Sequence, residues 1–306
     1  MRCCEAQVPL STLKVMELNL EAVTTPLRSA ATVMLLRDSQ AGLEIFLLKR
    51  HGLSDVLGGA YVFPGGKVDG ADAELDAHAH LDQAAPVLHA SLNEPEIDAL
   101  TASGLYVAAI REAFEECGIL FALGASQAQA TVARALSREG YAFDEVLAQL
   151  QLRLQTQSLA PWSRWITPRM PSVMNKRFDT RFFVAACPAD QIAMHDNHEA
   201  TESTWLTPRA ALEQYRSGQI ELAPPQIMSL AHLSRLGNVQ AVMTEARGRP
   251  PAVIQPEPFD QDGNRVICYP GDPRHSVQMR AMPGPTRLHY VNNRFEPTEG
   301  FDALWV

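Results

Sequence analysis

Three glutamates and an arginine are the residues whose types and spacing are best suited to chemistry. Residues 111–119 read Arg-Glu-Ala-Phe-Glu-Glu-Cys-Gly-Ile. On a helix, Glu112, Glu115 and Glu116 stand at i, i+3 and i+4 and therefore project from one face. Carboxylates this close repel one another, and hard oxygen donors of this kind select Mg²⁺, Mn²⁺ or Ca²⁺. The pattern predicts either a divalent-cation site or, as for most charge clusters at helical spacing, a solvated helix face.

The surrounding sequence predicts the helix that would carry these glutamates. Apolar residues recur at helical spacing through 105–117, and Gly118 is well placed to end the helix. Arg111 and Glu115 stand four residues apart and can pair, which would hold that carboxylate in a fixed pose. A Gly65-Gly66 turn follows a short strand predicted at 60–64. This turn, placed ahead of the helix, favours the cation site over the solvated face.

The glycine turn and the glutamate helix together resemble the signature of the Nudix hydrolase family. That signature is Gly, five residues, Glu, seven residues and then Arg-Glu-U-x-Glu-Glu-x-Gly-U, where U is a bulky aliphatic residue. Residues 111–119 fit its second half, with the smaller Ala113 at the first U, and residues 63–69 look like the strand-to-loop part of its first half. Two departures are visible. Asp72 stands at the position of the first Glu, and 38 residues instead of seven separate Asp72 from Arg111.

The long spacing resembles one branch of the family in particular. An insertion within the signature is a feature of the Nudix subfamily that includes the coenzyme A diphosphatases, which are peroxisomal in animals, and their bacterial relatives. The segments Phe178–Phe183, His198–Pro208 and Leu222–Pro225 are similar to that subfamily too. The resemblance implies an α/β fold, a Nudix α/β/α sandwich around a mixed β-sheet, and hydrolysis of a diphosphate with Mg²⁺ or Mn²⁺ as the cofactor.

The resemblance also implies roles for individual residues. Glu115 and Glu116 look like the principal metal ligands, and Glu112 like a third ligand or a residue that positions the attacking water. The Gly66 carbonyl matches a position that often binds the metal through the backbone, and Arg111 would orient Glu115. The predicted metal ligands are Gly66, Glu112, Glu115 and Glu116, and the predicted catalytic residues are Arg111, Glu112, Glu116 and Glu199.

The general base varies within the family, and here it is expected on a loop at 195–202. Glu199 and Glu202 are the candidates on that loop, and Glu199 is favoured. Charge on phosphoryl oxygens also has to be balanced by basic groups. The residues predicted to bind substrate in this way are Arg50, Lys67, Arg177 and Arg181, with Lys176 as a further candidate. The alternative for each is an ordinary surface or strand-end charge.

Composition and charge exclude several classes of protein. The 306 residues are 46% hydrophobic and 20% charged, as in ordinary globular proteins. A formal net charge of −9 argues against a nucleic-acid-binding protein, which would need a basic face. No apolar run is long enough for a membrane span, residues 1–20 lack the apolar segment of a signal peptide, and no C-x-x-C pair occurs. We therefore expect a cytoplasmic protein with neither membrane nor nucleic-acid partners.

The order of the predicted elements indicates two parts. A Nudix domain at 27–237 holds a partly helical insertion at about 71–104, which Ser103-Gly104 would close. A β-rich C-terminal extension at 238–306, where Pro, Gly and Asp become frequent, would pack on that domain. The other strands expected in the domain are 29–37, 43–49, 162–166 and 180–187, and its other helices are two within 127–155, one at 208–217 and one at 224–236.

These expectations describe a pyrophosphohydrolase that acts on a nucleoside diphosphate linked to another moiety. The resemblance implies coenzyme A or acyl-coenzyme A, cleaved to 3′,5′-ADP and (acyl-)phosphopantetheine, with ADP-ribose, NADH and dinucleoside polyphosphates as alternatives. A second hypothesis is a non-catalytic Nudix module that senses a nucleotide. Such modules usually lose one of the glutamates, and Glu112, Glu115 and Glu116 are all present. A homodimer is a further hypothesis, by analogy with relatives that dimerise.

Overall fold

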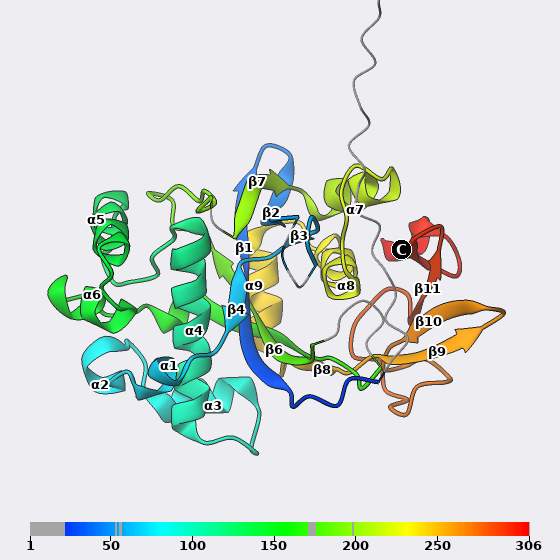
Figure 1. Cartoon of the computed structure of the whole chain (residues 1–306), viewed down its shortest axis with the longest axis horizontal. Coiled ribbons are helices and arrows are strands. Elements are labelled where there is room, and N and C mark those ends of the chain that lie inside the picture. Colours follow the sequence, from blue (N-terminus) through cyan, green and yellow to red (C-terminus); the bar gives the residue numbers. More distant parts are fainter. Residues whose placement is uncertain (1–21, 53, 55–56, 171–175, 198, 306) are drawn as a thin grey trace, which may run out of the picture.

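The computed structural model describes residues 22–305 except 53, 55–56, 171–175 and 198 (Figure 1). The segment considered for a signal peptide and His198 of the predicted loop lie outside the described residues. The strands of the main sheet are β1 (Arg28–Ser39), β2 (Gly42–Arg50), β3 (Tyr61–Val62), β4 (Gly65–Lys67), β5 (Leu159–Ile166), β6 (Phe178–Ala186), β7 (Ala200–Leu206) and β8 (Ala252–Ile254). The helices are α1 (Gly70–Glu74), α2 (Ala77–His80), α3 (Ala85–Leu92), α4 (Ala99–Cys117), α5 (Gln127–Arg138), α6 (Phe143–Gln149), α7 (Pro208–Arg216), α8 (Pro224–Leu233) and α9 (Val239–Gly248). Within the described ranges, no helix is both long and apolar enough to cross a membrane.

The main sheet is mixed, and its strand order places the glycine turn on a sheet edge. Over the described residues the order is β3-β2-β1-β6-β5-β8, with β4 pairing β1 and β7 pairing β2. Strand β1 is parallel to β6 along one edge. Its other edge is shared, because β2 pairs with Leu36–Ser39 and β4 pairs with Ala30–Thr32. The Gly65-Gly66 turn predicted from the sequence is therefore part of a short strand.

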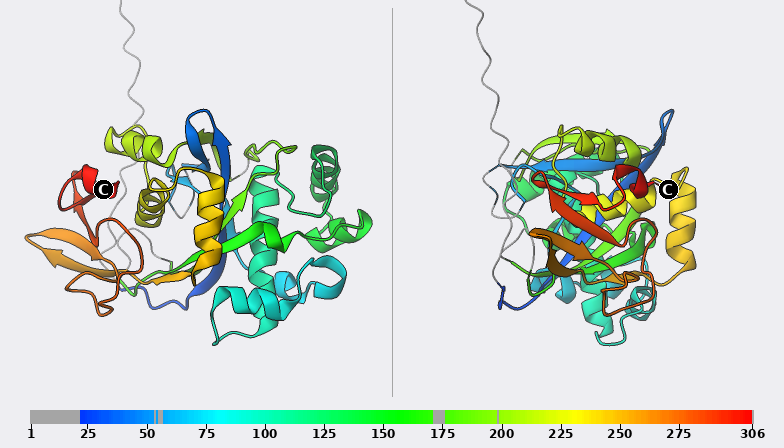
Figure 2. Two further views of the ribbon diagram at one scale, coloured as in Figure 1. Left: turned by 180° about the vertical axis from the view of Figure 1, so that it is seen from behind. Right: turned by 90° about the vertical axis from the view of Figure 1, so that its right-hand side faces the viewer.

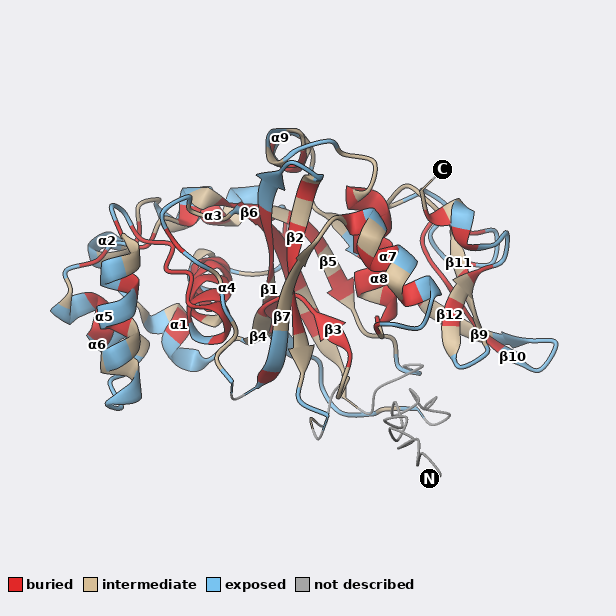
Figure 3. Cartoon of the chain, turned by 90° about the horizontal axis from the view of Figure 1, so that it is seen from above, coloured by how far each residue is buried: buried red, intermediate tan, exposed pale blue. Residues whose placement is uncertain are grey.

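Two hydrophobic cores lie on opposite faces of this sheet. Along β1, Val33 and Leu35 belong to the core beneath α4, whereas Met34 and Leu36 belong to the core beneath α7, α8 and α9. This alternation is the period-two pattern of a strand buried on both faces. Figure 3 shows α4 and α8 on opposite sides of the sheet, and the rear view in Figure 2 shows α9 crossing it. The predicted α/β/α sandwich around a mixed sheet is confirmed.

The helix that carries the glutamates begins earlier than the sequence suggested. It starts after Asp98, whose side chain accepts the backbone N–H of Thr101 at 2.7 Å. Gly104, predicted to close the insertion, lies inside α4. A Cβ atom there would lie 3.0 Å from the Cα of Ala73 in α1, so this glycine permits close packing of the two helices. The inserted segment contains α1, α2 and α3, in agreement with its predicted helical character.

The chain just after the boundary predicted at 237/238 contributes to the main sheet and its core. Helix α9 buries Val242, Met243 and Ala246 in the core of the main sheet, and β8 pairs with β5 at Ser163–Trp165. The separate C-terminal sheet therefore begins only after β8. Its order is β12-β11-β10-β9, formed by β9 (Glu257–Gln261), β10 (Asn264–Cys268), β11 (Arg287–Val291) and β12 (Arg294–Pro297). Figure 1 shows this sheet on the side of α8 away from α4.

Candidate active site

The second half of α4 holds the three glutamates on one face. Its opposite side, which includes Ile110 and Phe114, is buried in the core, and Gly118 ends the helix at a φ of 74°. The glutamates differ in exposure. Glu116 is 5% exposed, while the side chains of Glu112 and Glu115 are 13% and 47% exposed. A buried, a nearly buried and a half-exposed carboxyl group thus share one end of the helix.

The glycine turn lies directly against these carboxylates. The backbone N–H of Gly65 donates to Oε2 of Glu116 at 2.8 Å. A Cβ atom at Gly66 would lie 2.5 Å from Oε1 of Glu112, so a larger residue would displace that carboxylate from its present position. The two halves of the predicted signature therefore meet in space, despite the inserted residues between them.

Arg111 joins the turn, the insertion and the glutamates through hydrogen bonds. Its guanidinium donates to Glu112 and Glu115 at 2.9 Å each, and to the backbone carbonyl of Lys67 at 2.9 Å. Two further bonds of 2.9 Å reach both carboxylate oxygens of Asp72. Asp72 is a contributor that the sequence reasoning missed. Its position, where the signature has the first Glu, was the signal that could have identified it as a partner of Arg111.

Burial raises the pKa of all three carboxyl groups. The pKa of Glu112 rises to about 7, chiefly because the group is withdrawn from water, and Arg111 opposes this rise. Burial likewise raises the pKa of Glu116 to about 8, against the hydrogen bond from Gly65. The pKa of Glu115 is also raised by burial and opposed by Arg111. A nearby cation would favour the ionised form of each group.

The donor chemistry fits a hard divalent cation. The carboxylates of Glu112, Glu115 and Glu116 and the carbonyl of Gly66 are oxygen donors of the kind that Mg²⁺ and Mn²⁺ accept. Throughout the described part of the chain, no three acidic, histidine or cysteine side chains converge as a ready-made metal site. Glu115 bonds instead to Arg111, and Glu116 bonds to the Gly65 N–H. The predicted ligands are thus neighbours, held by protein partners in this structure.

A cavity of about 870 Å³ lies beside the glutamates. Gly66, Glu112 and Glu115 line one part of it. A wall of aromatic rings leads away from the glycine turn. Phe182 lies 6.2 Å, centroid to centroid, from Phe63 and also from Trp165. The cavity therefore combines a carboxylate-rich part with flat apolar surface.

The C-terminal segment supplies another wall of this cavity, whereas the insertion supplies none. Pro256, Pro258 and Ile267 line it, although they are far from the glutamates in sequence. The described residues 71–98 contribute no lining residue. No local sequence signal marks the C-terminal residues as cavity walls, because their place depends on how β9 and β10 pack on the main sheet.

The four residues predicted to bind substrate divide into two pairs. Arg50 and Lys67 line the cavity, and so does Lys176, whereas Arg177 and Arg181 do not. The Nε of Arg177 donates to the carbonyls of residues 167 and 168, and Arg181 is only 5% exposed. The alternation of β6 explains the position of Arg181. Its residues 178, 180 and 182 face the cavity, so the odd-numbered positions face the other way.

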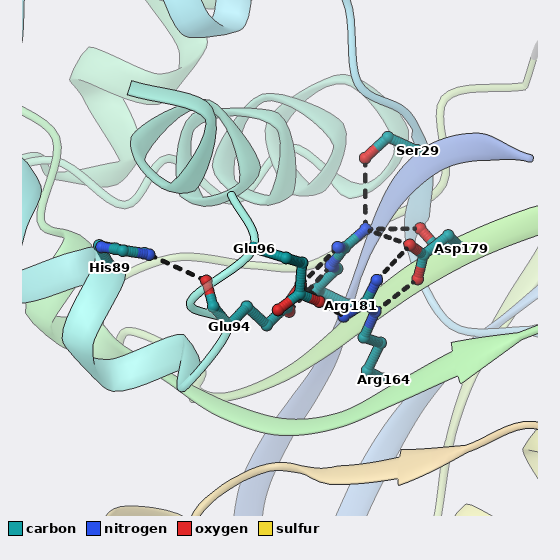
Figure 4. Close-up of polar contacts among 7 residues, drawn as sticks. All are labelled: Ser29, His89, Glu94, Glu96, Arg164, Asp179 and Arg181. Atoms are coloured by element: carbon teal, nitrogen blue, oxygen red, sulfur yellow. Dashed lines mark hydrogen bonds and ion pairs between the residues drawn. The ribbon is translucent and has the colours of Figure 1, made fainter. Parts of the chain in front are cut away.

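Arg181 belongs to a cluster of ion pairs that ties the insertion to the sheet (Figure 4). Its Nε and Nη2 donate to the two carboxylate oxygens of Glu94 at 3.0 and 2.5 Å. Arg164 of β5 bonds to Asp179 of β6 at 2.8 Å and also contacts Glu96. Glu94 and Glu96 lie in the connection between α3 and α4. The cluster therefore anchors the segment that leads into the glutamate helix.

Of the two candidates for the general base, only Glu199 lies with the glutamates. It lines the cavity, and its Oε2 lies 3.5 Å from Nη2 of Arg50. Glu202 belongs to β7, where the sequence had predicted a loop. Its carboxylate pairs with Lys49 at 3.4 Å and hydrogen-bonds Tyr61, whose ring is in the core on the α8 side of the sheet. Strand pairing with β2 therefore turns Glu202 away from α4.

Comparisons with known proteins agree with this architecture. A family model described as the NUDT19 Nudix domain matches residues 21–233, more than half of the chain. The acyl-coenzyme A diphosphatase NUDT19 of Xenopus laevis is 27% identical over 232 residues, which cover 64% of this chain and 61% of that protein. The human protein of the same name is 26% identical over 244 residues, covering 68% of this chain and 65% of its own length. The matched region thus spans less than two thirds of either relative.

A solved structure supports the fold. The crystal structure of a Nudix hydrolase from Alicyclobacillus acidocaldarius superposes with a TM-score of 0.55 at 24% identity, over 74% of this chain and 98% of that one. The family match covers the glycine turn, the glutamate helix and Glu199. On this evidence the chain belongs to the NUDT19 Nudix-domain family.

Proposed function

We propose that this protein is a divalent-cation-dependent pyrophosphohydrolase, which cleaves coenzyme A or acyl-coenzyme A to 3′,5′-ADP and (acyl-)phosphopantetheine. The observation that carries the proposal is the contact between the glycine turn and the α4 carboxylates at the cavity. There the Gly65 N–H holds Glu116, and Gly66 leaves space for Glu112. Carboxylates gathered beside a cavity with basic residues suit the hydrolysis of a phosphoanhydride.

Gly66, Glu112, Glu115 and Glu116 would hold Mg²⁺ or Mn²⁺. When bound, such a cation neutralises phosphoryl oxygens and lowers the pKa of a coordinated water. Protein side chains hold the carboxylates in place, bind the phosphoryl oxygens and accept the proton. Arg111 holds the Glu112 and Glu115 carboxylates in place through its hydrogen bonds.

The charged residues that line the cavity have separate roles in this proposal. Arg50 and Lys67 bind non-bridging oxygens of the diphosphate and stabilise the charge that develops on them. Glu199 takes the proton from the attacking water as the general base. Its ion pair with Arg50 keeps its carboxylate on the cavity side of the sheet.

The choice of substrate has two supports. The relatives in Xenopus and human are named acyl-coenzyme A diphosphatases. The cavity of about 870 Å³ is near the upper end of the range for small-molecule sites, and Trp165 and Ile267 give it apolar walls. A ligand with a charged diphosphate, a base and a long uncharged arm matches both parts of such a cavity. ADP-ribose, NADH and dinucleoside polyphosphates are the alternative substrates.

A substrate panel tests this proposal. The full chain is incubated with Mg²⁺ or Mn²⁺ and with coenzyme A, an acyl-coenzyme A, ADP-ribose, NADH or diadenosine tetraphosphate, and the products are identified by mass. We expect coenzyme A compounds to give 3′,5′-ADP with the highest kcat/KM. Preferred cleavage of another member would reassign the substrate. Tight binding of one member without cleavage of any would identify a nucleotide sensor instead.

A further inference from the structure

Gln226 is a buried polar residue in the cavity wall that the proposed chemistry does not use. It lines the cavity and is 7% exposed, and its Oε1 has no hydrogen-bond partner within the described residues. Buried polar atoms are nearly always paired in folded proteins, and an unpaired one is unfavourable. Arg50 is the other cavity-lining residue with such an atom in the described part of the chain, at its Nε. Arg50 contacts Glu199 at 3.5 Å, whereas Gln226 lies in the first turn of α8.

Gln226 places a backbone N–H and a side-chain carboxamide together at the start of α8. It is the third residue of α8, after Pro224 and Pro225, which also line the cavity and have no backbone N–H. Gln226 therefore carries the first backbone donor of this helix end, together with a carboxamide that both donates and accepts. Ala223, at the N-cap, contributes no side-chain hydrogen bond that would cover this end.

The walls of the cavity restrict what could bind there. Trp165, Phe182 and Ile267 line the same cavity with apolar surface. A phosphate would be a poor partner for the carboxamide oxygen, because both are acceptors. A flat group with apolar faces and an edge that offers an N–H beside an acceptor satisfies both the wall and the carboxamide. The edge of a nucleobase and a secondary amide have this chemistry in common.

We propose that Gln226, at the N-terminus of α8, forms a second subsite that binds an amide-like edge of the substrate, separate from the part that binds the diphosphate. This inference rests on the proposed function, because coenzyme A carries both an adenine base and the amides of its pantetheine arm. Gln226 would then determine specificity by hydrogen bonding, while Trp165 and Phe182 supply apolar contact area.

The two halves of coenzyme A serve as separate probes of this subsite. The affinities of the full chain for 3′,5′-ADP and for 4′-phosphopantetheine are measured by calorimetry for the wild type, Gln226→Leu and Gln226→Met. Gln219→Leu, at an exposed position, is the matched control. We expect both Gln226 variants to bind one of the two halves roughly five- to tenfold more weakly, and the control to bind like the wild type. A loss with 3′,5′-ADP assigns the base to the subsite, and a loss with phosphopantetheine assigns the amide arm.

Unchanged affinities for both halves in a folded Gln226 variant would overturn the subsite, as would a wild type that binds neither half. Circular dichroism identifies which of the two variants is folded. The proposed hydrolysis is scored separately, by the mass of the products that the wild type forms from coenzyme A with Mg²⁺. Cleavage with unchanged affinities in the variants refutes the subsite alone. Weakened binding in the variants without any cleavage by the wild type refutes the hydrolysis alone.

Discussion

Replacing Glu116 with Gln tests the electrostatic description of the glutamate cluster. Glu116 is 5% exposed and accepts the Gly65 N–H at 2.8 Å. Gln has nearly the same shape and can still accept that hydrogen bond, but it carries no charge. In the metal-free protein the substitution therefore removes a buried negative charge at every pH at which the carboxyl group of Glu116 is ionised in the wild type. In the presence of metal it removes a predicted ligand.

The magnitude follows from the pKa of Glu116, which burial raises from 4.5 to about 8. A carboxyl group whose pKa is raised by folding stabilises the folded state most when it is protonated. That contribution is fully present below pH 4.5 and is lost as the pH rises through about 8. At about 1.4 kcal/mol per pKa unit, the loss has an upper limit of about 5 kcal/mol. Allowing for relaxation of the site, we expect about 2–5 kcal/mol.

The assay is urea unfolding in EDTA at pH 6 and pH 9, for the wild type, Glu116→Gln and a control, Glu299→Gln, at an exposed position. About two of the pKa units of this loss fall between pH 6 and the folded pKa of about 8. Relative to the wild type, Glu116→Gln should therefore gain about 1–3 kcal/mol of unfolding free energy between pH 6 and pH 9, and the control should gain less than about 0.5 kcal/mol. Mg²⁺ should stabilise the wild type more than the variant at pH 9.

Hydrolysis by Glu116→Gln should fall at least about 100-fold, because a proposed metal ligand is lost while the fold remains. Two results would refute the reasoning. If the unfolding free energies of the variant and the wild type differ by the same amount at both pH values, ionisation of Glu116 does not destabilise the folded state. Full turnover by the variant would mean that Glu116 is not a metal ligand.

Three further substitutions test other contacts of the site. Gly66→Ala would place a methyl group 2.5 Å from the neighbouring carboxylate oxygen, so kcat/KM should fall about 100-fold with an unchanged circular dichroism spectrum; wild-type kinetics would contradict that contact. Glu199→Gln should lower kcat about 100-fold while Glu202→Gln stays within about twofold, and the reverse order in steady-state kinetics would make Glu202 the base. Arg181→Met removes one of the two arginine partners of buried Glu94, which keeps Arg164 at 2.9 Å, and should cost about 2–3 kcal/mol in urea unfolding, against less than about 1 kcal/mol for Arg177→Met. Similar losses for the two arginine variants would rule out the proposed anchoring by the buried ion pairs.

Local spacing was sufficient to predict the glutamate helix and to bring three of the four proposed metal ligands together. Because helix geometry repeats within a few residues, the i, i+3, i+4 pattern alone placed Glu112, Glu115 and Glu116 on one face. The strands β1, β2, β5 and β6 were predicted for the same reason, since alternation and apolar runs are local signals. The resemblance to the Nudix signature added that the glycine turn belongs beside this helix, which the Gly65–Glu116 hydrogen bond confirms.

Features that depend on distant partners could not be predicted in this way. Gly104 was predicted to close the insertion, yet it lies inside α4, where it permits close packing against Ala73. Arg181 had the same sequence signal as Arg50, and the face of β6 on which it lies decided that it pairs with Glu94 rather than with substrate.

The sequence by itself thus determined the position of the carboxylate face, because helix spacing is local, and its resemblance to the Nudix signature indicated the family and the fold class. Only the tertiary structure decided which basic side chains line the cavity and that Asp72 pairs with Arg111. It also decided that the C-terminal segment and Gln226 form walls of the cavity. The physical reason is that strand alternation, sheet pairing and the packing of the C-terminal sheet determine the direction of a side chain. None of these is encoded within a short window of sequence.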